Sequence, residues 1–268
     1  MLNIEKLLYR IILNYYYIYL NNQTYKIISC PSWNVRYESE ILYDKIIEEN
    51  KYNQIWLTPE QIELYLLDNN IWNQNYENIL KRLDTDIEDL KIDIYKNFYN
   101  TKSKEKFKKK LKTLYKQQND LKNKKDCMNY LGIKDYALSI KNEFIIRYSI
   151  YNMNNTLVFD PTMDDYNHSQ LQGFVREIID NSINPNDMRA LARSDFFRGY
   201  ASSSNLEKSL IDMTEEYKYL VNLYKMYDNA RQHPESPDED IINDDDALDG
   251  WFLYQQRKAK KEIGRAHV

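Results

Sequence analysis

Two amphipathic stripes in the middle of the chain constrain its fold most. Over residues 80–98 and again over residues 107–121, apolar side chains recur in steps of three and four, with Gln118 the one polar member. Such steps place side chains on a single face of an α-helix. The polar segment Asn100–Ser103 can turn the chain between the stripes. We therefore expect an antiparallel coiled-coil hairpin over residues 76–125.

The two arms of this hairpin differ in charge. Residues 77–96 carry six acidic and four basic side chains, whereas residues 102–125 carry two acidic side chains and eleven lysines. Opposite charge across the seam favours this pairing, although each exposed ion pair contributes only ~0.2–1 kcal/mol. A nucleic-acid-binding role for the lysine-rich helix 102–125 is the alternative reading. Because that helix has one tyrosine and no arginine, we favour a solvated helix face and do not expect nucleic acid as the partner.

The rest of the chain predicts a mainly α fold. Only 5 glycines and 6 prolines occur in 268 residues, which is too few for the recurring turns of a β-sandwich or barrel. One β-hairpin is expected at residues 15–29, where aromatic and β-branched residues flank a polar turn. A short strand is also possible at residues 156–159. The predicted fold class is a helical bundle with a long antiparallel coiled-coil hairpin and a small N-terminal β-hairpin.

Several local signals mark the starts of helices. Thr58, Pro59 and Gln61 form a capping box with proline at the first helical position, which predicts a helix from Pro59. Asn184 and Pro185 start another helix that should continue through Phe197, and Ser204–Glu207 is a second capping box. From these signals we divide the chain into consecutive ranges: 1–57, 58–151 with the hairpin, 152–233, and 234–262 with an acidic linker and a terminal helix.

The last six residues stand apart from these ranges. Residues 263–268 read as the translation of a common sequencing-adapter sequence, so we expect the native chain to continue differently after Glu262.

No catalytic, metal or cofactor site is expected. His168 and His233 lie far apart and have no ligand-spaced partner, and no glycine-rich phosphate loop or nucleophile turn occurs. The segment 244–250 superficially resembles a calcium loop but lacks essential oxygen donors. Cys30 and Cys127 suggest reduced thiols, and no membrane span is expected because the apolar N-terminal stretch is too short. The chain therefore reads as a non-enzymatic binding protein.

The terminal helix is the strongest candidate contact surface. Asp244, Asp245 and Asp246 are expected to cap it and to complement its positive dipole end. The apolar and aromatic residues that follow form an anchor: Leu248, Trp251, Phe252 and Tyr254. This anchor fits either a groove on a partner or the body of its own chain, and the sequence leaves these alternatives equally open.

The order of several segments resembles a group of poorly characterised virion-assembly proteins of large tailed, myovirus-like bacteriophages. The resemblance covers about residues 60–262 and is carried by the segments 86–91, 189–198, 226–229 and 241–251. It is most specific in the last of these. Phe196 and Phe197 stand where the pattern has a tryptophan. The hairpin at residues 15–29 lies outside it.

The resemblance implies a role in tail or baseplate assembly, as a chaperone-like factor or minor structural protein that binds other proteins. The expected partners are phage tail or baseplate proteins, with a homo-oligomer also open, in the host cytoplasm during assembly or in the virion. The expected protein-binding residues are Asp244, Asp245, Asp246, Leu248, Asp249, Trp251, Phe252, Arg189, Arg193 and Arg198.

Overall fold

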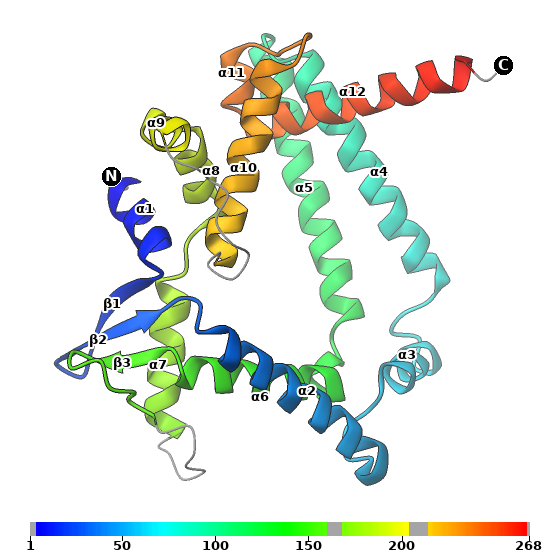
Figure 1. The fold of residues 1–268 in the computed structure, drawn as a ribbon. Coiled ribbons are helices and arrows are strands. Elements are labelled where there is room, and N and C mark those ends of the chain that lie inside the picture. Colours follow the sequence, from blue (N-terminus) through cyan, green and yellow to red (C-terminus); the bar gives the residue numbers. More distant parts are fainter. Residues whose placement is uncertain (1–3, 160–167, 204–213, 267–268) are drawn as a thin grey trace. The chain divides into compact units, whose positions relative to one another are not determined.

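A computed structural model describes residues 4–159, 168–203 and 214–266 of the chain. The predicted mainly α fold with a small N-terminal β-hairpin is confirmed. The chain forms two compact units, each built from two separate stretches (Figure 1). We call Met1–Trp56 with Ile133–Tyr227 the sheet unit, and Leu57–Gly132 with Asp228–Val268 the hairpin unit. The consecutive ranges expected from the sequence do not coincide with these units, because long-range packing joins distant segments.

The sheet unit contains one antiparallel sheet of three strands in the order β1 (Tyr15–Leu20), β2 (Gln23–Ile28) and β3 (Ile150–Asn152). The predicted β-hairpin is formed by β1 and β2. Its turn residues Asn21 and Asn22 have φ of 50° and 60°, a left-handed conformation that asparagine tolerates. The prediction of a strand at residues 156–159 is wrong. The third strand is β3, and Leu157 forms an isolated β-bridge with Tyr151.

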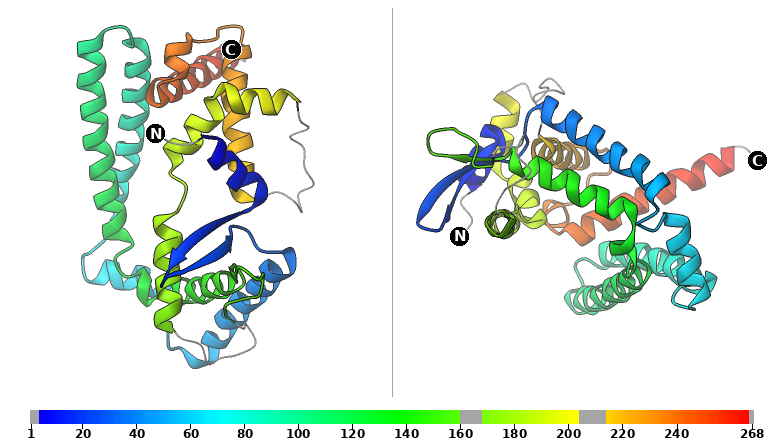
Figure 2. Two further views of the ribbon diagram at one scale, coloured as in Figure 1. Left: turned by 90° about the vertical axis from the view of Figure 1, so that its left-hand side faces the viewer. Right: turned by 90° about the horizontal axis from the view of Figure 1, so that it is seen from below.

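Helices cover this sheet and extend from it. They are α1 (Ile4–Leu13), α2 (Trp33–Asn53), α6 (Ile133–Arg147), α7 (His168–Asp180), α8 (Pro185–Arg193), α9 (Asp195–Ser203) and the first part of α10 (Glu215–Gln232), whose residues from Asp228 onward belong to the hairpin unit. Helix α7 packs on the sheet, where Phe174 meets Tyr25 edge-on at 4.7 Å between ring centroids. Helices α2 and α6 lie side by side (Figure 2).

Two predicted helix starts, at Pro185 and at Ser204, fall in this region. The helix from Pro185 does not continue through Phe197, because Ser194 has extended φ and ψ and separates α8 from α9. The capping box at Ser204–Glu207 lies outside the described residues. The helix that follows, α10, begins where Thr214 Oγ1 accepts a hydrogen bond from the Tyr217 amide at 3.0 Å.

The hairpin unit contains α3 (Pro59–Asp68), α4 (Gln74–Lys96), α5 (Thr101–Lys125), the 3-10 turn η1 (Asn129–Leu131), α11 (Glu239–Ile242) and α12 (Asp245–Ala266). Both hydrogen bonds of the predicted Thr58–Gln61 capping box are present. Helices α4 and α5 form the predicted antiparallel hairpin. The turn is earlier than expected, since Asn100 caps α5 through the Ser103 amide and Thr101 is already helical.

Helix α12 crosses the hairpin near its turn and packs mainly on α4 (Figure 1). Ala247 of α12 and Ile241 of α11 share one apolar cluster with the seam residues of the hairpin: Ile87, Leu90, Ile94, Phe98 and Leu111. The apolar stripes of α4 and α5 thus pack against each other and also against α12. No helix within the described residues is both long and apolar enough to cross a bilayer.

Candidate functional site

The predicted aromatic anchor of the terminal helix is buried in its own chain. Leu248 is 0 % exposed and Trp251 is 1 % exposed, and the His233 ring meets the Trp251 indole edge-on at 5.1 Å between centroids. Phe252 is half-buried beside Trp251. A side chain without accessible surface has no free area for a partner. The interpretation of Leu248 and Trp251 as exposed partner contacts is therefore wrong, and α12 belongs to the core of the hairpin unit.

The acidic residues of this segment are held by lysines of the hairpin. Asp244 Oδ1 accepts a hydrogen bond from the Ala247 amide at 3.3 Å, which confirms Asp244 as the helix cap. Lys108 Nζ lies 2.6 Å from Asp244 Oδ2 and 4.0 Å from Asp246 Oδ2. Burial raises the pKa of Asp246, while the charge of Lys108 acts in the opposite direction. Asp245, the first residue of α12, is half-buried.

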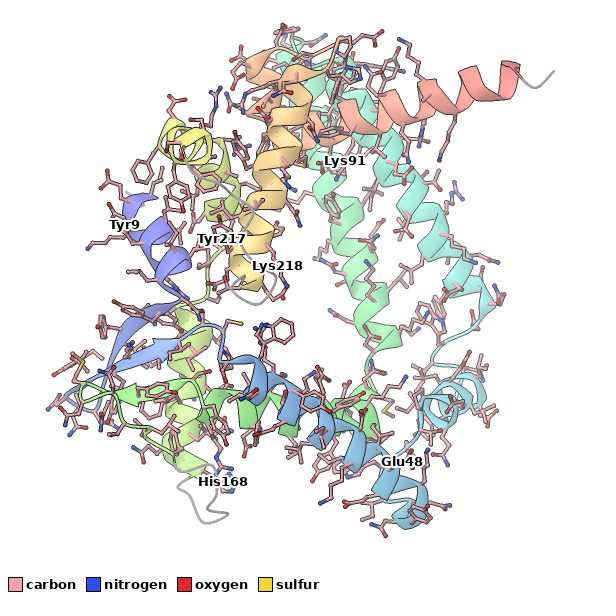
Figure 3. The ribbon with its side chains drawn as sticks, in the orientation of Figure 1. Tyr9, Glu48, Lys91, His168, Tyr217 and Lys218 are labelled. Atoms are coloured by element: carbon pink, nitrogen blue, oxygen red, sulfur yellow. The ribbon has the colours of Figure 1, made fainter. Side chains whose placement is uncertain are left out.

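A second ion pair fixes the next turn of α12. Lys91, labelled in Figure 3 where α12 crosses α4, lies with its Nζ 2.7 Å from Asp249 Oδ2. Burial acts to lower the pKa of Lys91, but its hydrogen bond to Asp249 and the charge of that carboxylate outweigh burial and raise it. Further along, Arg257 binds Glu88 at 3.1 Å and also binds Asp89. The acidic and basic groups of this region therefore serve intramolecular packing.

The three arginines of the predicted site belong to the sheet unit. Arg193 places its guanidinium carbon 5.3 Å from the centroid of the Tyr227 ring, and Arg198 pairs with Asp195 at 3.4 Å. Arg189 is half-buried on α8. The acidic members of the predicted site lie in the other unit. The structure therefore does not assemble these ten residues into one contact surface within a unit.

The lysine-rich arm presents a different surface. Among the described residues only one ion pair joins α4 to α5, between Glu77 and Lys125 at 3.0 Å. Most of the ion pairs expected between the acidic arm and the lysine-rich arm are therefore not formed. Seven exposed lysines of α5 have no acidic partner in the described part of the chain. Lys122 lies on another side of the helix, and the other six are Lys102, Lys106, Lys109, Lys110, Lys112 and Lys116. We call these six residues the lysine face.

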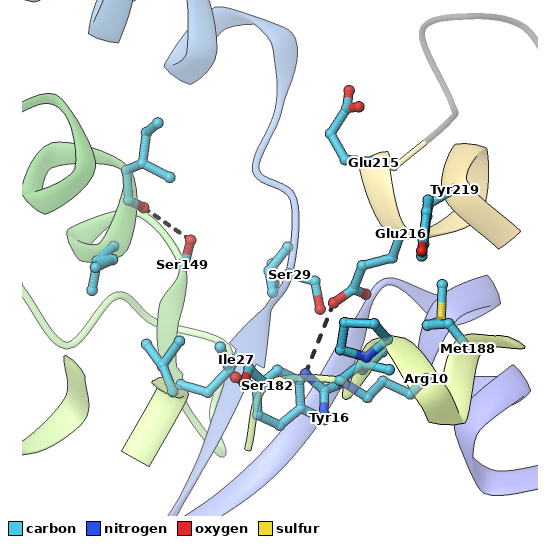
Figure 4. Close-up of a pocket in the computed structure, with 16 residues that line it drawn as sticks. Arg10, Tyr16, Ile27, Ser29, Ser149, Ser182, Met188, Glu215, Glu216 and Tyr219 are labelled. Atoms are coloured by element: carbon cyan, nitrogen blue, oxygen red, sulfur yellow. Dashed lines mark hydrogen bonds and ion pairs between the residues drawn. The ribbon is translucent and has the colours of Figure 1, made fainter. Parts of the chain in front are cut away.

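The sheet unit holds a cavity of about 460 Å³. Its wall is mostly aliphatic, with side chains such as Ile27, Ile146, Ile178 and Met188 from β2, α6, α7 and α8. Arg10 of α1 and Glu216 of α10 enter it from the polar end, close to Ser29 (Figure 4). No spacing in the sequence marks this cavity, because its lining comes from strands and helices far apart in the chain.

The polar end of the cavity is built around Arg10. Its guanidinium lies 3.7 Å from the centroid of the Tyr16 ring, and its Nη1 donates a hydrogen bond to the Asn181 carbonyl at 2.6 Å. Its Nη2 lies 4.0 Å from Glu216 Oε1. Burial raises the pKa of Glu216, against the charge of Arg10 and the nearby Ser29 hydroxyl. Burial likewise raises the pKa of Tyr16.

No family model, curated protein or solved structure matches this chain. The resemblance to phage assembly proteins therefore stays a prediction. Within the described ranges, no group of three or more histidine, cysteine, aspartate or glutamate side chains is arranged to hold a metal ion. The candidate sites are consequently two: the lysine face of the hairpin unit and the cavity of the sheet unit.

Proposed function

We propose that this chain is a binding protein of bacteriophage tail or baseplate assembly, chaperone-like or a minor structural component, and that it contacts its partner through the lysine face. The observation that supports a binding role is the lysine face itself, six exposed lysines on one helix with no acidic partner in the described residues. The assignment to virion assembly rests on the resemblance of residues 60–262. The partner is expected to be a tail or baseplate protein with an acidic surface.

The geometry of α5 makes this face continuous. A helix advances roughly 100° and 1.5 Å per residue, so Lys102, Lys106, Lys109 and Lys116 lie within roughly 80° of one another around the axis. They extend over about 21 Å of helix length. The buried seam residue Leu111 points to the opposite side. A rigid hairpin thus holds a row of positive charges away from its own core.

The physical chemistry of such a face favours a partner with negative charge. Exposed lysines on one surface raise the local potential and speed the encounter with an acidic partner. Because each ammonium is a strongly hydrated point charge, single contacts are weak and the row acts collectively. The helix carries two acidic residues, Glu105 among these lysines and Asp120 four positions after Lys116, against eleven lysines, so intrahelical neutralisation is small.

Nucleic acid is the second candidate ligand of the lysine face. It is favoured because the lysines of this face have no acidic side chains paired with them in the described residues. A phosphate backbone would be bound without sequence preference, since the face carries no arginine for bidentate contacts. Such binding weakens steeply with salt, with a slope of log K against log salt of about −0.9 per neutralised phosphate on duplex DNA. The salt dependence of nucleic-acid binding therefore measures how many lysines take part.

The test compares two fourfold variants of equal charge. The first replaces Lys102, Lys106, Lys109 and Lys116 by Gln. The control replaces four exposed lysines outside the lysine face, Lys81, Lys122, Lys134 and Lys225, by Gln. Each protein is used for affinity capture from cells that co-express the neighbouring phage genes, and is titrated with duplex DNA at several salt concentrations. Circular dichroism checks that both variants keep the parental helix content.

The assembly proposal expects the parental chain and the control variant to retain one tail or baseplate protein that the lysine-face variant loses. If the parental chain captures only nucleic acid, and the salt slope falls by about 3–4 in the lysine-face variant, the nucleic-acid candidate replaces it. If both variants bind like the parental chain, the lysine face is not the contact surface.

A further inference from the structure

The sheet has a free hydrogen-bonding edge at β1. The strand order places β1 at one end of the sheet, and no other strand of the described residues lies beyond it (Figure 1). The Ser29 amide donates a hydrogen bond to the Asn14 carbonyl at 3.0 Å, which continues the register of β1 and β2 by one pair. Bonded pairs alternate along an antiparallel ladder, so the residues of β1 whose backbone groups point away from β2 are Tyr15, Tyr17 and Tyr19.

These outward backbone groups have no partner in the described part of the chain. No backbone hydrogen bond joins Tyr15, Tyr17 or Tyr19 to an element other than β2, and Tyr17 and Tyr19 are 52 % and 65 % exposed. An open edge can pair with another strand, and proteins usually protect it with lysine, proline or a bulge. β1 contains neither lysine nor proline, and its register with β2 is unbroken.

The opposite edge of the sheet is protected. β3 has only three residues, and the chain folds back beside it. The Asn152 amide donates to the Thr156 carbonyl at 2.9 Å, and the Val158 amide donates to the Ile150 carbonyl at 3.0 Å. Of the two outer strands of this sheet, β1 is therefore the one that offers a long, unbonded edge.

The chemistry of β1 selects a second copy of the same strand as its partner. β1 has no charged side chain, so two copies meet without like-charge repulsion. Antiparallel pairing centred on Tyr17 sets Tyr17 opposite Tyr17 of the second copy, and Tyr15 opposite Tyr19. Every outward backbone group then has a partner, with about six hydrogen bonds in all. Lys26, which lies opposite Tyr17 on β2, stays three strand spacings, ~14 Å, from its equivalent, which exceeds the Debye length at physiological salt.

We infer that two copies of this chain form a two-fold dimer through β1, in which their sheets join into one continuous sheet. Tyr15 and Tyr17 share one face of the strand, where their rings meet edge-on at 5.6 Å between centroids. In the dimer this face carries cross-strand tyrosine pairs. The assembly is closed, because the strands at both ends of the joined sheet are the short, protected β3 strands.

This inference goes beyond the proposed assembly function and does not depend on it. β1 lies in the sheet unit, whereas the lysine face lies in the hairpin unit. A dimer that captures no tail or baseplate protein would support the inference and count against the proposed function. A monomer that captures such a protein through the lysine face would do the reverse.

The test uses the two-fold axis at Tyr17. Tyr17→Glu sets two carboxylates opposite each other and should raise the dimer Kd by about 10-fold or more. Within its own copy the new carboxylate faces Lys26, so β1 should keep its pairing with β2. Tyr17→Lys alone should also weaken the dimer, whereas an equimolar mixture of the two variants sets Lys opposite Glu and should recover a dimer with one copy of each.

Sedimentation velocity of the full chain over a concentration series measures dimerisation. Native mass spectrometry of the mixture, with one variant ¹⁵N-labelled, identifies the mixed dimer. Tyr37→Lys is the matched control, since Tyr37 is 68 % exposed on α2 and its replacement should leave the dimer Kd unchanged. Circular dichroism checks that each variant keeps the parental secondary structure.

Hydrogen exchange of the parental chain locates the interface without any substitution. The amides of Tyr15, Tyr17 and Tyr19 should exchange more slowly at high protein concentration than at low concentration, because only the dimer bonds them. The amide of Ile18, which bonds to β2 in both states, should change much less. A chain that stays monomeric at high concentration, a dimer that Tyr17→Glu does not weaken, or unchanged exchange of the three tyrosine amides would each overturn the inference.

Discussion

Lys91 Nζ lies 2.7 Å from Asp249 Oδ2, and this ion pair joins two residues that are 158 positions apart. Their side chains are 15 % and 29 % exposed, so water screens the pair only in part. One turn of α12 is thereby fixed on α4, next to the buried Ala247 and Trp251. The pair therefore helps to hold the acidic start of α12 in the folded hairpin unit.

The first prediction concerns Asp249→Asn. We expect it to lower the free energy of unfolding of the hairpin unit by about 1–3 kcal/mol, between the values for exposed and buried pairs. Chemical denaturation at pH 7 measures this. The largely exposed pair Lys51–Glu48 provides the control, since Glu48→Gln should leave stability unchanged. An equal effect of both changes would contradict the structural role of the Lys91–Asp249 pair.

The same pair makes a prediction for alkaline pH. The folded-state pKa of Lys91 is raised above its ordinary value of 10.5. The stabilisation from the pair is therefore complete below pH 10.5 and is lost as the pH rises through the raised value. The stability difference between the parental chain and Asp249→Asn should be constant from pH 7 to 9 and then shrink above 10.5. A difference that stays constant up to high pH would refute this linkage.

Gly250 provides a sharp test of the contact between α12 and α4. A Cβ at this position would overlap the carbonyl oxygen of Lys91 and lie 3.1 Å from Tyr95 Cβ. Because a backbone carbonyl cannot move aside without shifting its helix, Gly250→Ala should destabilise the hairpin unit by about 3 kcal/mol or more. Gly199→Ala is the matched control: nothing lies within 4 Å of its added Cβ, so it should be neutral or stabilising by up to ~1 kcal/mol. Thermal unfolding compares the two.

Trp251 tests whether the terminal helix is part of the core. Since the side chain is 1 % exposed, Trp251→Ala should cost about 3–5 kcal/mol. Trp33→Ala, at a position that is 46 % exposed, should cost much less. Hydrogen exchange should show faster exchange of amides in α12 and in the facing part of α4 for the first variant only. Unchanged protection of α12 in Trp251→Ala would mean that the helix is held by other contacts.

Burial of Glu216 should make the stability of the sheet unit depend on pH in the acid range. Its folded-state pKa is raised above 4.5 by burial, so the folded state binds this proton more tightly than the unfolded state does. Stability relative to a Glu216→Gln variant should therefore increase as the pH falls from the raised value to 4.5, and should change no further below it. Urea unfolding of both proteins between pH 7 and 4 measures the difference. A constant difference, or one that decreases with acid, would contradict the burial of this carboxyl group.

The sequence by itself determined the local elements of this protein. The two apolar stripes, the Thr58 capping box and the Asn21–Asn22 turn each specify a helix, a helix start or a hairpin, because their geometry depends on residues within a few positions. Only the tertiary structure decided which surfaces remain exposed. Trp251 is buried, and Lys91 and Lys108 are paired, because α12 and its cap Asp244 pack on the hairpin; the paired residues are 158 and 136 positions apart in the chain. The cavity depends in the same way on the packing of distant segments, and no local pattern encodes contacts of that kind.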